Sequence, residues 1–313
     1  MSYLDTFYMD SADKKSSLHV MRWLPDSGNV KAVLQIAHGI AEHIARYDTF
    51  ARYMTDNGFA VIGNSHLGHG LSSPDETCRG VFADKKGWDL AVDDMHLLYD
   101  QTHAQYPARP YFLLGHSMGS FLARTFIIRY PCLLTGCILS GTGQQPTSLL
   151  NIGLVAAGIE KTLFGAAKPS VRLDRLSFGG YNKRIPHHRT SRDWLSRDSE
   201  IVDRYESDEA CGFAPSAGMF IDMLGGIKFI GKKKHIAKMR QTLPVLLISG
   251  GEDPVGDYGR GPKKVYDLFT AAGLRDVTLK SYEGARHEVL NETNRHEVHG
   301  DILRWIQDEM PEA

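Results

Sequence analysis

Short apolar runs alternate with stretches of helical periodicity over both ends of the chain. Residues 32–39 (AVLQIAHG) and 110–117 (PYFLLGHS) are apolar runs typical of buried strands. The same reading predicts strands at 18–25, 59–65, 137–141, 243–250 and 277–284, and helices at 48–58, 87–105, 120–130, 262–272 and 293–309. Strand 18–25 alternates like an edge strand. The pattern predicts an α/β fold with a doubly wound, mostly parallel sheet covered by helices on both faces.

The alternation stops in the middle of the chain. Residues 143–240 contain no convincing buried strand, and short helical patterns and polar, Arg-rich loops take their place. We therefore expect a core domain in two parts, 1–142 and 241–313, with an inserted, mainly helical cap at 143–240. The apolar stretch from Leu149 to Phe164 either guides a substrate chain or forms a helix buried against the core, since apolar helical patterns usually indicate packing.

A G-x-S-x-G motif at 115–119 marks the candidate nucleophile, Ser117. An apolar strand leads into the motif and an apolar-periodic helix leads out, which is the context that a nucleophile elbow requires. The serine sits on a tight, strained turn, so glycines two residues to either side avoid clashes. Ser117 is either a catalytic nucleophile or an ordinary turn residue, and this context favours the nucleophile.

The acid and the base of a Ser-His-Asp triad follow the serine in chain order in this architecture, each after a later strand. Asp253 lies three residues beyond strand 243–250, while Glu252 and Asp257 are its competitors. His287 is the histidine that directly follows strand 277–284, whereas His296 and His299 are interpreted as a solvated helix face. A histidine in this place takes the serine proton, and the aspartate fixes its tautomer.

Two backbone N–H groups are expected to stabilise the oxyanion of the reaction. One belongs to Met118, the residue after the nucleophile, and the other to the loop after strand 32–39, where Ile40 is the candidate. His38 in that loop is interpreted as a structural residue that hydrogen-bonds loop backbone.

Four blocks of residues resemble the monoacylglycerol lipase and lysophospholipase-like branch of the α/β hydrolases. They are HGIAEHIARY (38–47), HLGHGLS (66–72), GHSMGS (115–120), and the pair SGGEDPVGDYGRG and YEGARHEVLNE that carries the acid and the base. The resemblance implies hydrolysis of a fatty-acyl ester such as a monoacylglycerol, without a metal or organic cofactor, under a cap that holds the acyl chain. It also implies that His116 and a cap glutamate, here Glu200, contact the glycerol end.

Composition and charge limit the kinds of partner that we expect this protein to bind. The formal net charge of −1 gives no bulk field that would favour nucleic acid. None of the four cysteines forms a C-x-x-C pair, which argues against a zinc or redox motif. Residues 1–15 lack the apolar core of a secretory signal, so we expect a cytoplasmic protein that contacts a membrane or micelle only transiently, through its cap. The sequence leaves the oligomeric state open.

Other functions on the same fold stay open at this point. The alternatives to a monoacylglycerol lipase are a lysophospholipase, an acyl thioesterase or a small-peptide aminopeptidase. A non-catalytic binding homologue is disfavoured because all three triad residues are present. Lys232, Lys233 and Lys234 either attract anionic lipid headgroups or, as such runs usually do, form a solvated helix end.

Overall fold

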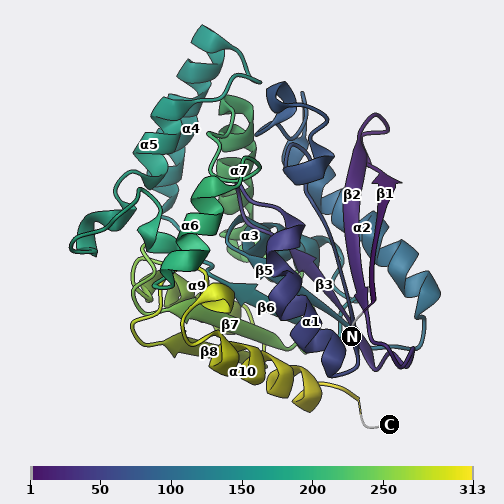
Figure 1. The fold of residues 1–313 in the computed structure, drawn as a ribbon. Coiled ribbons are helices and arrows are strands. Elements are labelled where there is room, and N and C mark those ends of the chain that lie inside the picture. The colour runs from purple at the N-terminus through teal and green to yellow at the C-terminus, as the bar shows by residue number, and fades with distance from the viewer. Residues whose placement is uncertain (1–2, 312–313) are drawn as a thin grey trace.

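The computed structural model describes residues 3–311, which form an eight-stranded sheet flanked by helices (Figure 1). The strand order is β1-β2-β4-β3-β5-β6-β7-β8, and every pairing from β4 to β8 is parallel. The strands are β1 Tyr3–Asp10, β2 Ser17–Leu24, β3 Ala32–Ala37, β4 Phe59–Asn64, β5 Tyr111–His116, β6 Gly136–Ser140, β7 Val245–Gly250 and β8 Val277–Tyr282. The predicted α/β-hydrolase class and the mostly parallel sheet are confirmed.

Alternating side chains of the central strands fill two separate cores. On β3, Val33 packs on one face and Leu34 on the other, because successive strand residues point to opposite faces. One face is covered by α1 (Asp48–Asp56) and α10 (Arg295–Asp308), and the other by α2 (Gly87–Gln105), α3 (Met118–Arg129) and α9 (Arg260–Ala271). Burial on both faces explains why these strands have continuous apolar sequences.

Helices replace strands between β6 and β7. The segment forms α4 (Thr147–Phe164), α5 (Val171–Phe178), α6 (Ser199–Ser207), α7 (Ala217–Ile230) and α8 (Lys233–Ile236). Within residues 3–311 no strand falls in this stretch, although Pro169 and Ser216 form an isolated antiparallel bridge. Short 3₁₀ turns complete the described chain: Ile44–Tyr47, Gly70–Ser72, Glu76–Cys78, Tyr181–Arg184, Asp193–Leu195 and Val289–Asn291. In Figure 1, α4 to α7 stand together on one side of the sheet.

Two of the sequence-based expectations are wrong. β2 is not the edge strand, because β1 pairs antiparallel with it and forms the edge. His299 does not lie on a solvated face, since it is 1% exposed and its Nε2 lies 2.9 Å from the carbonyl oxygen of Leu290. Burial lowers the pKa of His299 to about 4, so this imidazole is a neutral core residue.

Candidate active site

Ser117 occupies a strained turn between β5 and α3. Its backbone has φ 50° and ψ −118°, in a region that residues other than glycine rarely adopt. Its N–H donates to the carbonyl oxygen of Ser140 on β6 at 2.9 Å, and its own carbonyl accepts from the N–H of Ser120 at 2.9 Å. Hydrogen bonds on both sides hold the residue in this conformation, at the end of β5 and the start of α3.

The two motif glycines are required by close backbone contacts. A Cβ atom on Gly115 would lie 2.3 Å from the carbonyl oxygen of Gly119, and a Cβ on Gly119 would lie 2.0 Å from the carbonyl oxygen of Ala37. Both distances are shorter than any tolerated contact, and the atoms that would be met belong to backbone. The helix after the nucleophile can therefore approach the sheet only because both positions lack a side chain.

His287 and Asp253 contact each other beneath the surface. His287 Nδ1 lies 3.0 Å from Asp253 Oδ2, and both residues are buried. The second oxygen of Asp253 accepts from the N–H of Val255 at 2.8 Å, which fixes the carboxylate in its loop. The competing acids, Asp257 and Glu252, are exposed. The geometry therefore favours Asp253 as the partner of His287.

The surroundings of His287 raise its pKa. Burial alone would lower the pKa, but the Asp253 carboxylate and its hydrogen bond raise it, and the carboxylates of Glu288 and Glu42 add to that effect. The net shift is upward from the ordinary value of 6.5. The arrangement stabilises the imidazolium that a general base becomes after it accepts a proton.

The loop after β3 and the start of α3 present the two predicted oxyanion donors to the same cavity. Ile40 and Met118 both line it together with Ser117. Within residues 3–311, neither of their N–H groups donates to another protein atom. His38 is a structural residue, as expected: its Nε2 accepts from the N–H of His66 at 2.9 Å.

A buried ion network joins the oxyanion loop to the base. Glu42 accepts from the N–H of Gly39 at 2.5 Å and from the Tyr47 hydroxyl at 2.9 Å. Arg46 Nη1 donates to Glu42 at 2.6 Å, and its two Nη atoms donate to Glu288 at 2.6 and 2.7 Å. Burial raises the pKa of the Glu288 carboxyl, but Arg46 outweighs burial and holds it well below its usual range. The network ties the loop of Ile40 to the residue that follows His287.

Of the two expected substrate contacts, one lies at the cavity and the other does not. His116 is buried, lines the cavity, and its ring centroid lies 4.7 Å from that of His287. Burial and then the neighbouring His287 lower the pKa of His116 to about 4, so it is a neutral hydrogen-bonding group. Glu200 is exposed in the first turn of α6, after its N-cap Asp198, and does not line the cavity. The predicted contact of Glu200 does not match the structure, because the start of α6 faces solvent.

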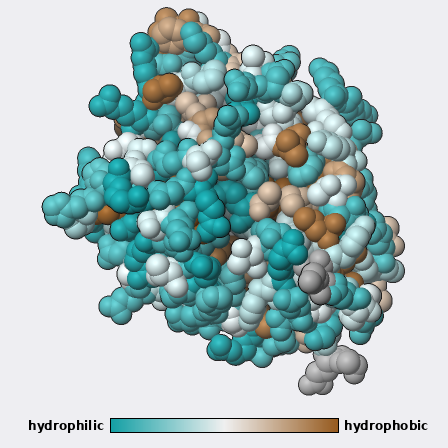
Figure 2. Space-filling model, in the orientation of Figure 1, coloured by the Kyte–Doolittle hydropathy of each residue, from teal (hydrophilic) through white to brown (hydrophobic). Residues whose placement is uncertain are grey.

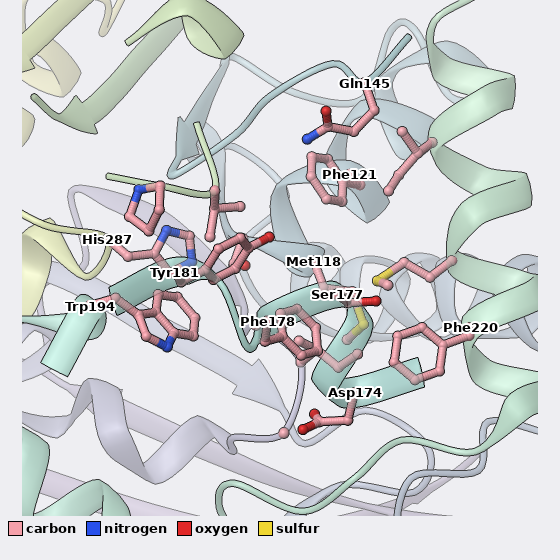
Figure 3. A pocket seen from close by; sticks show the side chains of 18 of the residues that line it. Met118, Phe121, Gln145, Asp174, Ser177, Phe178, Tyr181, Trp194, Phe220 and His287 are labelled. Carbon is pink, nitrogen blue, oxygen red and sulfur yellow. The ribbon is translucent and has the colours of Figure 1, made fainter. Parts of the chain in front are cut away.

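A cavity of about 500 Å³ extends from the candidate triad into the segment between β6 and β7. A series of aromatic side chains, each in contact with the next, lines this cavity. It begins at Trp194, whose ring centroid lies 5.3 Å from that of His287. It continues through Tyr181 and Phe178 to Phe220. Figure 3 shows His287, Tyr181 and Trp194 at one side of the view and Phe220, on α7, at the other. A volume and an apolar wall of this kind are typical of small-molecule sites.

Helix α4 lies at the rim of the cavity rather than inside the core. Of its residues only Leu150 and Ala157 are buried, so the alternative of a helix fully buried against the core is wrong. The part that lines the cavity is Leu149, Leu150, Ile152 and Gly153. Figure 2 shows hydrophobic side chains at the top of the view, over the region of α4 and α5 in Figure 1.

The chain is similar to known proteins over most of its length. The model of the family described as serine aminopeptidase, S33, matches residues 28–294. The chain belongs to this family. It is therefore a serine hydrolase of the α/β-hydrolase superfamily, as its fold and motifs predicted.

Two curated relatives and one solved structure match nearly the full chain. Monoglyceride lipase of Mus musculus is 29% identical, covering 99% of this chain and 93% of the relative. Monoacylglycerol lipase of Mycolicibacterium smegmatis is also 29% identical, covering 91% and 90%. The crystal structure of a thermostable carboxyl esterase from Bacillus coagulans, in complex with glycerol, has a TM-score of 0.90 at 27% identity and covers 98% of this chain and 99% of its own.

Sequence analysis does not reveal two groups of residues at this site. Glu42 and Arg46 fall within the HGIAEHIARY block, but nothing in the sequence indicates that Arg46 pairs with Glu288. Trp194 lies about 90 residues before His287 in the chain, yet its carbonyl accepts from the N–H of His287 at 3.3 Å. Only the folded structure brings the turn Asp193–Leu195 against the base.

Proposed function

We propose that this serine hydrolase cleaves fatty-acyl esters of glycerol, with monoacylglycerols as its substrates. The observation that carries the proposal is a cavity that holds Ser117 and His287 at a polar end and continues along an apolar, aromatic wall. One ester molecule fits this division, because its carbonyl reaches the serine while its acyl chain replaces water on the apolar wall. The names of the mouse and mycobacterial relatives and the glycerol in the esterase complex support the same substrate class.

In the proposed mechanism Ser117 attacks the ester carbonyl carbon while His287 takes the hydroxyl proton. The carbonyl oxygen becomes an oxyanion that the N–H groups of Ile40 and Met118 stabilise. His287 then gives its proton to the departing glycerol oxygen, which leaves an acyl group on Ser117. Water, deprotonated by His287, then attacks the acyl carbonyl carbon. His287 returns this proton to the oxygen of Ser117 as the bond to the acyl group breaks, which releases the fatty acid. Asp253 keeps the Nδ1 proton of His287 in place throughout. The proposed mechanism uses no metal or cofactor.

The polar end fits an uncharged alcohol. The carboxylates of Glu42 and Glu288 line it, but their oxygens accept from Gly39, Tyr47, Arg46 and Asn291. An ammonium group, as in an aminopeptidase substrate, would find both of these carboxylates already paired. A phosphate, as in a lysophospholipid, would meet the carboxylates of Glu42 and Glu288, and Arg46, which pairs with them, does not line the cavity. We propose that glycerol hydroxyls instead hydrogen-bond to the neutral imidazole of His116.

We also propose that residues 143–240 act as a cap that touches lipid surfaces transiently. The exposed side chains of α4 and α5 that do not line the cavity include Val155, Ile159, Leu163 and Val171, which are 65%, 55%, 66% and 70% exposed. Apolar groups that face solvent in a row mark a contact surface. None of the helices within residues 3–311 is long and apolar enough to cross a membrane.

A hydrolysis panel tests the substrate class. Purified protein would be given 1-monooleoylglycerol, lysophosphatidylcholine, oleoyl-coenzyme A and leucine p-nitroanilide, with the Ser117→Ala variant as the matched control. We expect kcat/KM for the monoacylglycerol to exceed the other three by at least about tenfold, which corresponds to 1.4 kcal/mol of transition-state stabilisation. A preference for leucine p-nitroanilide would reassign the protein as an aminopeptidase, and activity retained by Ser117→Ala would refute the mechanism.

A further inference from the structure

Three potential metal ligands meet where the segment between β6 and β7 contacts the core. His43 precedes the turn Ile44–Tyr47 in the loop after β3, Asp208 follows α6, and Cys211 lies three residues further on. His43 Nε2 lies 2.8 Å from Asp208 Oδ2, and one ligand atom from each of the three residues lies within 4.8 Å of the other two. No sequence motif indicates this cluster, because 165 residues separate His43 from Asp208.

We propose that His43, Asp208 and Cys211 bind a divalent transition-metal ion of the zinc type. Imidazole nitrogen, carboxylate oxygen and thiolate sulfur are the three protein ligands of zinc, and three of them leave a fourth position for water. On binding, the ion replaces the hydrogen bond between His43 and Asp208. The thiol proton of Cys211 passes to solvent, and the sulfur enters the coordination sphere as thiolate.

Carboxylates offset the guanidinium groups around the three ligands. Arg192, which donates to the carbonyl oxygen of Gly212 at 3.2 Å, pairs with Asp174 at 3.9 Å. Arg46 lies close to Cys211 and over the ring of Tyr205, at 4.8 Å from its centroid. Its positive charge is opposed by two carboxylates, Glu42 and Glu288, so that the three groups together carry one negative charge. Asp208 adds a second negative charge before the thiol ionises. The side chains of His43 and Asp208 are 16% and 37% exposed, which leaves the ion a path from solvent.

Bound metal would join two segments that already touch beside the oxyanion loop. The N–H of Gly212 and the hydroxyl of Tyr205 both donate to the carbonyl oxygen of Ala41, at 2.9 Å each. Ala41 follows Ile40, so the site would fasten the cap to the loop that carries a proposed oxyanion donor. The site itself does not depend on the proposed reaction, and its test requires no substrate.

Cobalt(II) is the probe that detects this site, because a cobalt–thiolate bond adds an intense near-ultraviolet charge-transfer band to the visible ligand-field bands. Reduced, tag-free protein carrying Ser117→Ala would be stripped with chelator and titrated with Co²⁺. We expect one equivalent to bind with such a band, Zn²⁺ to displace it, and the melting temperature to rise by several degrees when Co²⁺ is saturating.

Variants separate this site from adventitious binding to other histidines or thiols. Cys211→Ser should abolish the charge-transfer band, and His43→Gln and Asp208→Asn should each weaken binding at least about tenfold. Cys132→Ser is the matched control, because Cys132 is exposed and outside the cluster. If Cys211→Ser fails to fold, Cys211→Ala takes its place. No thiolate band at millimolar Co²⁺, or a band that survives in a folded Cys211 variant, would overturn the proposal.

Discussion

Arg46 donates two hydrogen bonds to Glu288, at 2.6 and 2.7 Å, and so links the loop after β3 to the residue that follows His287. Both side chains are nearly buried, with 11% and 4% of the side chain exposed. A bidentate pair of this kind fixes orientation as well as distance. We infer that Arg46 is a positioning residue, which sets the oxyanion loop and the base relative to each other.

Removing Arg46 should damage both stability and catalysis. In Arg46→Met, Glu42 and Glu288 lose their shared counter-charge in a buried place, which typically costs about 3–5 kcal/mol of unfolding free energy. Urea denaturation measures this loss. The matched control is Arg304→Met, because Arg304 pairs with Asp301 at 3.4 Å on the surface with 72% of its side chain exposed, and such pairs contribute about 0–1 kcal/mol. Equal effects of the two substitutions would contradict the role of the network.

The candidate triad should behave as a unit. Ser117→Ala and His287→Ala should each lower kcat by several orders of magnitude on a monoacylglycerol, with KM changed little, because the groups act together in the transition state. Asp253→Asn should also be severe, since an amide presents the wrong hydrogen bond to His287 Nδ1. Asp257→Asn is the control and should be near normal. Near-normal activity of Asp253→Asn would show that the acid has been misassigned.

The pH dependence follows from the raised pKa of His287. The base must be neutral, so kcat/KM should rise with pH through the pKa of His287 in the free enzyme. Because the net shift is upward, the midpoint should lie above about 6.5, the value of an unperturbed histidine. Asp253→Asn removes the main raising group and leaves burial, which lowers the pKa, so the midpoint should fall. A wild-type midpoint below about 6, with chemistry rate-limiting, would be inconsistent with this electrostatic environment.

Two isoleucines of α4 distinguish acyl binding from membrane contact. Ile152 lines the cavity, whereas Ile159, two turns away, is similarly exposed but does not. Ile152→Asp should reduce kcat/KM on dodecanoyl esters much more than on acetyl esters, because each buried CH₂ contributes roughly 0.8 kcal/mol. Ile159→Asp should leave hydrolysis of monomeric esters unchanged and weaken binding to phosphatidylcholine vesicles. If both variants lose short- and long-chain activity equally while folded, α4 is scaffold and not a substrate guide.

The fold was predictable because its central strands, β3 to β7, are buried on both faces and have continuous apolar sequences. The sequence 110–117 leads into Ser117 with the apolar run of a central strand, and the structure places β5 there. β1 escaped prediction because it is an edge strand whose residues, apart from Met9, are at most half-buried. Asp5 and Thr6 interrupt its apolar residues, so its sequence lacks the continuous apolar run of the central strands.

The site was only partly predictable, because local sequence locates some of its residues and tertiary packing alone locates the others. Ser117, Asp253 and His287 each follow a strand, so local sequence and chain order locate them. Glu200 was placed by resemblance in the segment that the family pattern constrains least, and the structure leaves it exposed in the first turn of α6. Trp194 reaches His287 through tertiary packing alone, which no local pattern encodes.

Labelling by a fluorophosphonate tests the central claim most directly, because only a serine activated by a base in an intact oxyanion hole reacts rapidly with it. Intact-mass spectrometry should show a single adduct per chain, peptide mapping should place it on Ser117, and 1-monooleoylglycerol should slow the reaction by occupying the cavity. Ser117→Ala should gain no adduct, and His287→Ala should react orders of magnitude more slowly. An adduct on another residue, or equal labelling of Ser117→Ala, would contradict the account.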